Sequence, residues 1–361
     1  LFFKMDRFAA DASRLVIASI LGQGIAIAAM PLITRLYSSH DFGVYSIYSS
    51  MLGIFSSLAC FRYERAIPLP KDDVIATYVF LLAFALGTLF SLCLFLLIPI
   101  FGHLFVSWLK FPGFYPYLWL LPVGVWGASV YTVLSFWAVR QQRFKRLAST
   151  KIAQGFGQVF AQLGFAFLPF AALGLLLGQV VGHTAGSGGL AVDIYRRDGH
   201  LFSSVTISRL LGVLKRYSRF IYFSTPATVL NSIAFYVPAV LLTVQHGVAV
   251  AGYYGLASQA VRMPLSLIEA SVGKVYLGNA AKLIHEDPSK LLKFYLSTIF
   301  KLFLIGVVPA AALLFFGPAL FSRIFGVHWH QAGIYARILS VMFLVEFSIV
   351  APSQNLTLLE M

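Results

Sequence analysis

The sequence predicts an all-α, polytopic membrane protein with about ten transmembrane helices. Of its 361 residues, 59% are hydrophobic and 11% are charged, a balance that leaves too little polar surface for a soluble domain of this size. The apolar residues form runs of roughly 20 residues, the length that a helix needs to cross about 30 Å of hydrocarbon. Basic residues gather at the N-terminus and in every second gap between these runs, as in a chain that crosses a bilayer repeatedly.

Six predicted spans lie in the first half of the chain. The first contains Pro31, and the third is long enough to tilt or to protrude from the membrane. A stretch rich in proline, glycine and aromatic residues, 110–116, precedes the fourth, and the fifth and sixth are separated only by a tight turn. The six spans are 15–34, 43–61, 74–100, 117–138, 152–169 and 171–194.

A polar, basic stretch over 195–219 divides the chain and is predicted to be a cytoplasmic linker. Four further spans follow it, at 220–244, 248–272, 294–316 and 332–351. We therefore expect an N-terminal six-helix lobe at 1–194 and a C-terminal lobe at 220–361, of which four helices are present. An even number of spans before the linker sends both halves into the membrane in the same direction, as parallel repeats do.

The distribution of positive charge predicts which side of the membrane faces the cytoplasm. Most of the 27 Lys and Arg residues fall at the N-terminus or after the second, fourth, sixth and eighth spans, which places all of these segments in the cytoplasm. This bias and anionic lipid headgroups account for the net charge of +14. We therefore expect no nucleic-acid partner, and membrane lipids are the expected surroundings.

Polar residues inside the eighth span form the clearest candidate site. At 100° per residue they fall within an arc of roughly 80°, on one face of the helix. Arg262 lies near mid-depth, where a buried charge usually faces a cavity. Its functional interpretation is a ligand for phosphate or sugar, and the alternative is an ion pair with Glu269 or another carboxylate. The stripe consists of Gln259, Arg262, Ser266 and Glu269.

A second polar stripe lies in the fifth span, where three glutamines recur every four residues: Gln154, Gln158 and Gln162. Amide side chains both donate and accept hydrogen bonds, which suits sugar hydroxyls. Hydrogen bonds between helices explain the pattern equally well.

In the sixth span glycines recur every four residues from Gly174 to Gly186, which predicts a face for close helix packing.

The remaining charges in or near the spans supply weaker candidates. Glu346 lies near the middle of the last span and is the best candidate for proton or sodium coupling, the alternative being an ion pair with Arg262 or Arg337. Glu64 stands between Arg62 and Arg65, where we expect a surface ion cluster or, alternatively, part of a gate. Arg35 is near the outer end of its span. It is a candidate for the cavity, and the alternative is that its long side chain simply snorkels to water. Arg35, Arg62 and Arg65 complete the cavity candidates, and Glu64 the coupling candidates.

Three sequence blocks carry a family resemblance. Residues 31–46 (PLITRLYSSHDFGVYS) and 62–70 (RYERAIPLP) resemble the opening of Wzx-type polysaccharide flippases of the multidrug/oligosaccharidyl-lipid/polysaccharide (MOP) exporter superfamily. Residues 252–264 (GYYGLASQAVRMP) are similar to the start of the eighth helix in that family. The family usually has 12 or more spans, so we expect this chain to be a fragment that lacks the last helices.

The resemblance implies a function as well as a fold. It implies two lobes around a central cavity and transport, by alternating access, of polyprenyl-diphosphate-linked oligosaccharide from the cytoplasmic to the periplasmic leaflet. The product would serve O-antigen or other surface polysaccharide synthesis, in a bacterial inner membrane. A polysaccharide polymerase and chain-length machinery are the implied protein partners.

Flipping breaks no covalent bond, so we expect no enzymatic activity, no catalytic residue, no metal site and no cofactor beyond an ion gradient. A multidrug or cation antiporter of the MATE type and a lipid II flippase remain alternatives, and a membrane glycosyltransferase or polymerase is a more distant one. An antiporter for organic cations would favour an acidic, aromatic cavity, whereas Arg262 and the glutamines suit an anionic glycolipid.

Overall fold

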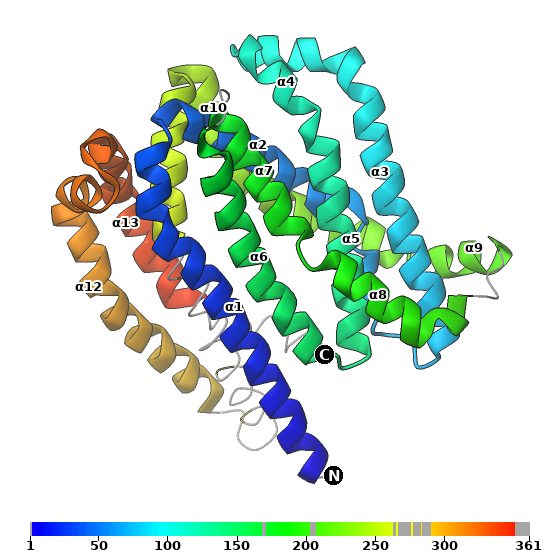
Figure 1. Ribbon diagram of the computed structural model, residues 1–361. Coiled ribbons are helices and arrows are strands. Elements are labelled where there is room, and N and C mark those ends of the chain that lie inside the picture. The colour runs from blue at the N-terminus through cyan, green and yellow to red at the C-terminus, as the bar shows by residue number, and fades with distance from the viewer. Residues whose placement is uncertain are drawn as a thin grey trace. The chain divides into compact units, whose positions relative to one another are not determined.

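The computed structural model describes residues 2–167, 171–202, 207–262 and 290–350, together with the single residues 265, 276 and 283. Every regular element in this part of the chain is helical, so the predicted all-α fold is confirmed (Figure 1). Seven helices among the described residues are long and apolar enough to cross a membrane, and the protein is therefore a multi-pass membrane protein. They are α1 (Phe2–Leu36), α2 (Ser39–Ala59), α3 (Asp73–Trp108), α5 (Leu120–Arg140), α10 (Thr225–His246), α12 (Leu291–Phe325) and α13 (His330–Ile349).

The other predicted spans correspond to helices of different lengths. The fifth is α6 (Phe144–Gly164), and the sixth, expected as one helix over 171–194, is divided into α7 (Ala171–Thr184) and α8 (Ser187–Asp198). The break falls at Gly186, whose φ of +87° is a left-handed conformation that glycine adopts without steric cost. The predicted span 248–272 is helical over 248–262, and most of its remainder lies outside the described residues.

The chain forms two compact units, which are considered separately. Unit 1 comprises Leu1–Ala26 and His40–Ala251, and unit 2 comprises Ile27–Ser39 and Gly252–Met361. Helix α1 therefore contributes its first part to unit 1 and its last turns to unit 2. Compact units defined by contacts are not the same as transport lobes, so the predicted lobes 1–194 and 220–361 stay a prediction.

The core of unit 1 lies where α3 and α5 pack together. Trp137 of α5 is fully buried, and its ring lies 5.3 Å from that of Phe80 on α3 and 5.8 Å from that of Phe202. Phe202 belongs to a short helical turn, Gly199–Phe202, inside the predicted linker. Burial of such large aromatic rings is the main driving force for packing at this place.

The predicted linker 195–219 is largely helical and packs on unit 1. It contains the end of α8 and the amphipathic helix α9 (Ile207–Arg216). Val213 of α9 is buried in the core beside Leu210 and Leu214. The hydroxyl of Tyr63 also donates a hydrogen bond of 2.8 Å to the carbonyl oxygen of Leu214. The apolar face of α9 thus covers the core, while its basic residues are exposed.

Glycines allow helices of unit 1 to approach closely. Figure 1 shows α6 and α7 running side by side, and on α7 a Cβ at Gly178 or Gly182 would meet side chains of α6. The predicted packing face of α7 is therefore confirmed at these two glycines. Elsewhere on α6, Gly155 meets the backbone of Gly22 on α1, so that neither position leaves room for a side chain.

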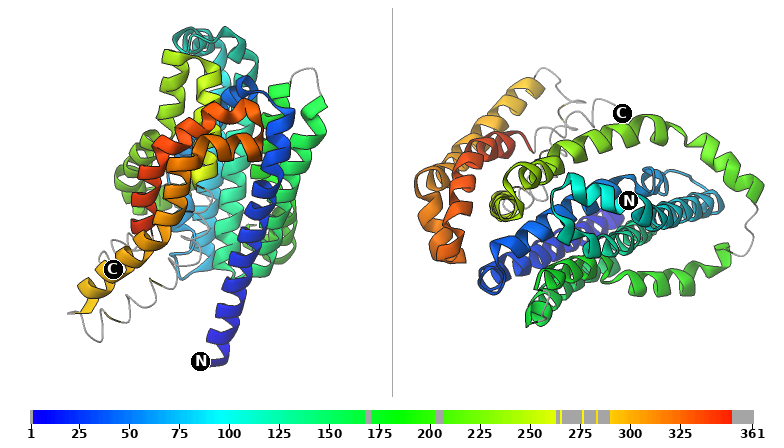
Figure 2. Two further views of the ribbon diagram at one scale, coloured as in Figure 1. Left: turned by 90° about the vertical axis from the view of Figure 1, so that its left-hand side faces the viewer. Right: turned by 90° about the horizontal axis from the view of Figure 1, so that it is seen from above.

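In unit 2, α12 and α13 form an antiparallel hairpin, closed by the short turn Val327–Trp329 (Figure 2). Gly317 and Gly333 face each other across the pair, and a Cβ on Gly317 would lie 2.7 Å from the Gly333 carbonyl oxygen. The indole nitrogen of Trp329 donates a hydrogen bond of 2.8 Å to the carbonyl oxygen of Thr34. This bond attaches the last turns of α1 to the hairpin.

Candidate functional site

The candidate site in unit 2 is an ion pair between side chains of two predicted transmembrane helices. The Nη2 atom of Arg262 lies 3.8 Å from Oε1 of Glu346, and the Nε of Arg262 donates a hydrogen bond of 3.3 Å to Oγ of Ser258. The side chains of Arg262 and Glu346 are 20% and 34% exposed. The ion pair offered as the alternative for Glu346 is thus present, and it joins helix 248–262 to α13.

The geometry of this pair leaves it open to competition. At 3.8 Å the contact is electrostatic rather than a short hydrogen bond. A guanidinium has five N–H donors and matches phosphate oxygens in a bidentate manner. Both side chains are partly exposed, so an anion that reaches Arg262 can replace Glu346 as its partner.

The other members of the predicted stripe are placed only in part. Gln259 is half-buried, one turn before Arg262, whereas Ser266 and Glu269 lie outside the described residues. Arg35, also in unit 2, is exposed in the last turn of α1, which agrees with the snorkelling alternative.

The glutamine stripe of α6, in unit 1, faces a neighbouring helix. Gln158 and Gln162 lie against the glycines of α7, with the Gln158 carbonyl oxygen 3.0 Å from where a Cβ of Gly178 would stand. Gln154 instead accepts a hydrogen bond of 3.2 Å from the Nζ of Lys151. Packing between helices therefore explains Gln158 and Gln162, and their role as sugar ligands stays a prediction.

Lys151 is a cation that the sequence patterning assigns to a cytoplasmic loop. The structure places it within α6, with its Nζ atom 4.9 Å from the centre of the Tyr131 ring. The Tyr131 hydroxyl shares a hydrogen bond of 2.9 Å with Thr150. The helical position of Lys151 was not predicted from the sequence, because the positive-inside rule counts charges near span ends without distinguishing helix from loop.

A charged cluster in unit 1 surrounds the short helix Tyr63–Ala66, outside the candidate spans. The prediction of a surface cluster is wrong for Glu64, which is 5% exposed. Nη1 of Arg62 lies 3.6 Å from Oε1 of Glu64, while Arg65 is exposed. Glu64 Oε2 and Arg62 Nε have no hydrogen-bond partner among the described residues. An ion pair of this length only partly compensates the loss of water.

The electrostatics of this cluster follow from burial. Loss of water raises the pKa of the Glu64 carboxyl, against the opposing effects of its own backbone N–H, Arg62 and Arg65. Loss of water likewise lowers the pKa of the Arg62 guanidinium, assisted by Arg65. Phe61 and Arg62 both have positive φ angles, 48° and 64°. Strained backbone of this kind persists only where surrounding contacts hold it in place.

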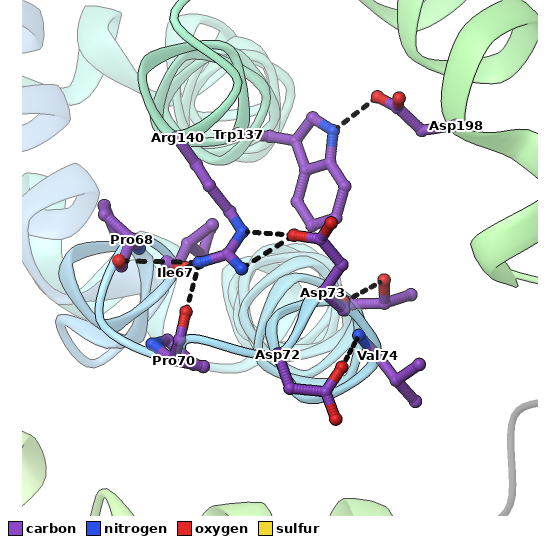
Figure 3. Close-up of polar contacts among 10 residues, drawn as sticks. Ile67, Pro68, Pro70, Asp72, Asp73, Val74, Trp137, Arg140 and Asp198 are labelled. Carbon is purple, nitrogen blue, oxygen red and sulfur yellow. Dashed lines mark hydrogen bonds and ion pairs between the residues drawn. The ribbon is translucent and has the colours of Figure 1, made fainter.

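Arg140, at the end of α5, organises the loop between this cluster and α3 (Figure 3). Its guanidinium donates two hydrogen bonds to Oδ1 of Asp73, at 2.7 and 3.1 Å, and one of 2.6 Å to the carbonyl oxygen of Pro70. Weaker contacts reach the carbonyl oxygens of Ile67 and Pro68. Sequence reasoning treated Arg140 as a topological charge, and no local motif identifies its role.

The comparisons with known proteins bear on the family and the fold. A family model described as a polysaccharide biosynthesis protein matches residues 32–333. No curated protein matches the sequence. Solved structures of transporters are similar in fold, at sequence identities too low to carry function.

Three such structures illustrate this likeness. An inward-facing multidrug resistance MATE family transporter of the MOP superfamily has a TM-score of 0.62 and 16% identity, over 95% of this chain and 81% of that one. The eukaryotic MATE transporter AtDTX14 has a TM-score of 0.58 and 14% identity, over 97% and 83%. A MOP superfamily transporter from Pyrococcus furiosus has a TM-score of 0.54 and 16% identity, over 96% and 84%.

The family model covers most of the chain, and the transporter structures share its helical fold over nearly the whole length. The resemblance found in the three sequence blocks is therefore confirmed. The chain belongs to the polysaccharide biosynthesis protein family and has the fold of MOP superfamily transporters.

Proposed function

We propose that the protein is a flippase that moves polyprenyl-diphosphate-linked oligosaccharide from the cytoplasmic to the periplasmic leaflet by alternating access. One observation carries the proposal: a chain of a polysaccharide biosynthesis family has the fold of MOP transporters. Polysaccharide precursors are made on one side of a membrane and used on the other. A transporter fold in such a family meets that need without any covalent chemistry.

The Arg262–Glu346 pair supplies a chemical basis for substrate binding. The substrate carries a diphosphate, and a diphosphate offers more negative charge to Arg262 than the single carboxylate 3.8 Å away. When the diphosphate replaces it, Glu346 is left without its cation and takes up a proton or sodium ion. Release of substrate reverses the exchange. Coupling of transport to an ion gradient thus follows from competition for one guanidinium.

The cellular setting is part of the same proposal. The proposed location is a bacterial inner membrane, with the N-terminus and the basic segments in the cytoplasm, and the charge bias supports this orientation. O-antigen or another surface polysaccharide is the proposed product. The proposed partners are the polysaccharide polymerase and the chain-length machinery, which receive the flipped substrate.

Complementation tests the proposal. A strain that lacks its own flippase would receive the complete protein, either unchanged or with Arg262→Ala, Arg262→Lys or Glu346→Gln. We expect Arg262→Ala to abolish surface polysaccharide and Arg262→Lys to restore part of it, because lysine keeps the charge but not the bidentate geometry. Arg323→Ala is the matched control, since Arg323 is exposed in the last turn of α12. Immunoblots of the membrane fraction verify equal amounts of protein.

Normal surface polysaccharide with Arg262→Ala would contradict the assignment of Arg262.

A MATE-type cation antiporter is the second candidate, favoured by the fold likeness to multidrug transporters. That function predicts drug resistance lost with Glu346→Gln and no restoration of surface polysaccharide by any form of the protein. Proteoliposomes with a fluorescent polyprenyl-diphosphate sugar distinguish a flippase from a glycosyltransferase, because flipping leaves the lipid chemically unchanged.

A further inference from the structure

A basic cavity of about 670 Å³ lies in unit 1 at the turn between α5 and α6. Among the described residues that line it, four are cations and one is a carboxylate. The charged lining residues are Arg143, Lys145, Arg146, Arg197 and Asp193. The described residues that line the cavity all belong to unit 1, whereas Arg262 and Glu346 belong to unit 2.

The acidic residues near the cavity are already engaged by arginines. Arg143 donates hydrogen bonds to Asp193 at 3.1 Å and to Asp198 at 2.7 Å, and Arg197 pairs with the other oxygen of Asp193 at 3.1 Å. Asp198 also accepts a bond of 2.8 Å from the indole nitrogen of Trp137 (Figure 3). These bonds fix the guanidinium of Arg143 at the cavity wall and compensate its charge.

Lys145 and Arg146 have no such compensation. Both are exposed, and neither has a carboxylate within 4.0 Å among the described residues. The Arg146 guanidinium donates only to a neutral acceptor, the carbonyl oxygen of Gly189 at 3.2 Å. Two adjacent cations in one basic cavity repel each other, and a bound anion removes that repulsion.

The position of these cations on α6 increases the effect. Lys145 and Arg146 lie in the first turn of a 21-residue helix, next to the positive end of its dipole. This turn contains no acidic residue, and its N-cap, Arg143, makes no side-chain capping bond. First-turn backbone N–H groups without intrahelical partners are donors for an anion.

We propose that this cavity binds a phosphate group, held by Lys145 and Arg146 with Arg143 as a third, fixed cation. In the predicted orientation the cavity faces the cytoplasm, where anionic headgroups concentrate. The phosphate diester of a membrane lipid and a soluble phosphate share the chemistry that the cavity recognises. The inference does not rest on the flippase function, because binding here is measured without transport.

The experiment compares phosphate ligands on the purified protein in detergent. Native mass spectrometry would follow binding of phosphatidylglycerol and, separately, of phosphatidylcholine, with inorganic phosphate added as a competitor in a second series. The variant Lys145→Gln/Arg146→Gln removes both uncompensated charges. Arg209→Gln/Lys215→Gln, on exposed positions of α9, removes two charges from unit 1 elsewhere. Thermal melts establish that both variants are folded.

We expect Lys145→Gln/Arg146→Gln to weaken phosphatidylglycerol binding about tenfold or more, which corresponds to about 1.4 kcal/mol, and the α9 control to change it less than about twofold. Competition by inorganic phosphate at millimolar concentration would support a site for the phosphate group as such. No competition, with the same loss in the variant, would support a site for the lipid headgroup. Phosphatidylcholine should bind more weakly than phosphatidylglycerol, because its choline cation offsets the charge of the same phosphate diester. Equal losses in both variants, or no loss in Lys145→Gln/Arg146→Gln, would overturn the proposal.

Discussion

Arg262 and Glu346 lie 3.8 Å apart and connect helix 248–262 to the last described helix of the chain. Each is the other's counter-charge in a segment with few other charges. Removing Arg262 therefore leaves Glu346 without this counter-charge, while removing both leaves no carboxylate to compensate. This asymmetry makes the pair testable without a transport assay.

A double-mutant cycle is the first prediction. Arg262→Ala and Glu346→Gln should each lower the melting temperature, and the double variant should be more stable than the sum of the single losses predicts. A coupling free energy of about 0.5 to 3 kcal/mol is typical for side chains in contact. Tryptophan fluorescence during heating in detergent measures it. Strictly additive effects would show that the two charges do not interact.

The buried carboxyl of Glu64 predicts an unusual pH dependence. Burial raises its pKa above the ordinary value of 4.5, so the folded state binds the proton more tightly than the unfolded state does. The contribution of Glu64 to stability is therefore greatest below pH 4.5 and falls as the pH rises through the raised pKa. The charged groups around Glu64 are Arg62 and Arg65, and Cys60 is its titratable neighbour.

Glu64→Gln keeps the volume and removes the titration. We expect the variant and the parent to melt at similar temperatures at acid pH, and the variant to melt at a higher temperature at neutral pH. Melting curves from pH 4.5 to 7.5 measure this difference. A parent that becomes more stable than the variant as the pH rises would mean that the ion pair with Arg62 outweighs the loss of water.

Arg140 provides a prediction about geometry rather than charge. Arg140→Lys keeps the charge but cannot reproduce a fork that reaches Asp73 and the loop carbonyl oxygens together. We expect it to lower the free energy of unfolding by about 1 to 3 kcal/mol, as buried acceptors lose their donor. Asp73→Asn should cost less than about 1 kcal/mol, because the Asp73 side chain is 54% exposed. Equal losses would contradict the importance of the carbonyl contacts.

Two glycines of α1 form a matched pair for testing helix packing. A Cβ at Gly22 would meet the carbonyl oxygen of Lys151, whereas nothing lies within 4 Å of a Cβ at Gly24. Gly22→Ala should therefore destabilise the protein by about 1 to 3 kcal/mol through overpacking. Gly24→Ala should be neutral or stabilise it by up to about 1 kcal/mol, because alanine favours the helix. Equal melting temperatures for the two variants would exclude close packing of α1 on α6.

The helical architecture could be predicted because crossing a bilayer directly determines the length of the apolar runs and the charge of the loops between them. The bounds of α2 and α13 lie within four residues of the predicted runs, whereas α3 continues eight residues beyond its predicted end, over 101–108. The division of 171–194 escaped prediction because a single left-handed glycine, Gly186, breaks the helix without any change in hydropathy. The packing of α9 was also missed, since its amphipathic pattern is short and strongly basic.

The sequence identified single candidate residues, but in most cases it did not predict which residues they contact. Glu346 was selected for its depth in a span, and Arg262 was one of two partners considered for it. Glu64 was assigned to the surface because its two arginine neighbours suggested water, whereas the fold buries it beside one of them. Contacts across distant segments, such as Arg143 with Asp193, have no local sequence signature.

The exposure pattern of α3 indicates which part of this long helix faces lipid. Residues 76–80 are buried by other parts of unit 1, whereas Leu89, Leu96 and Leu104 are more than half exposed. At 1.5 Å per residue, residues 85–108 extend about 36 Å, close to one hydrocarbon thickness with a modest tilt. The exposed face of α3 over residues 85–108 would thus meet lipid tails, whereas the preceding three turns are shielded by other parts of unit 1. Spin labels placed along α3 would measure this difference, because labels that face lipid are more accessible to oxygen than labels that protein shields.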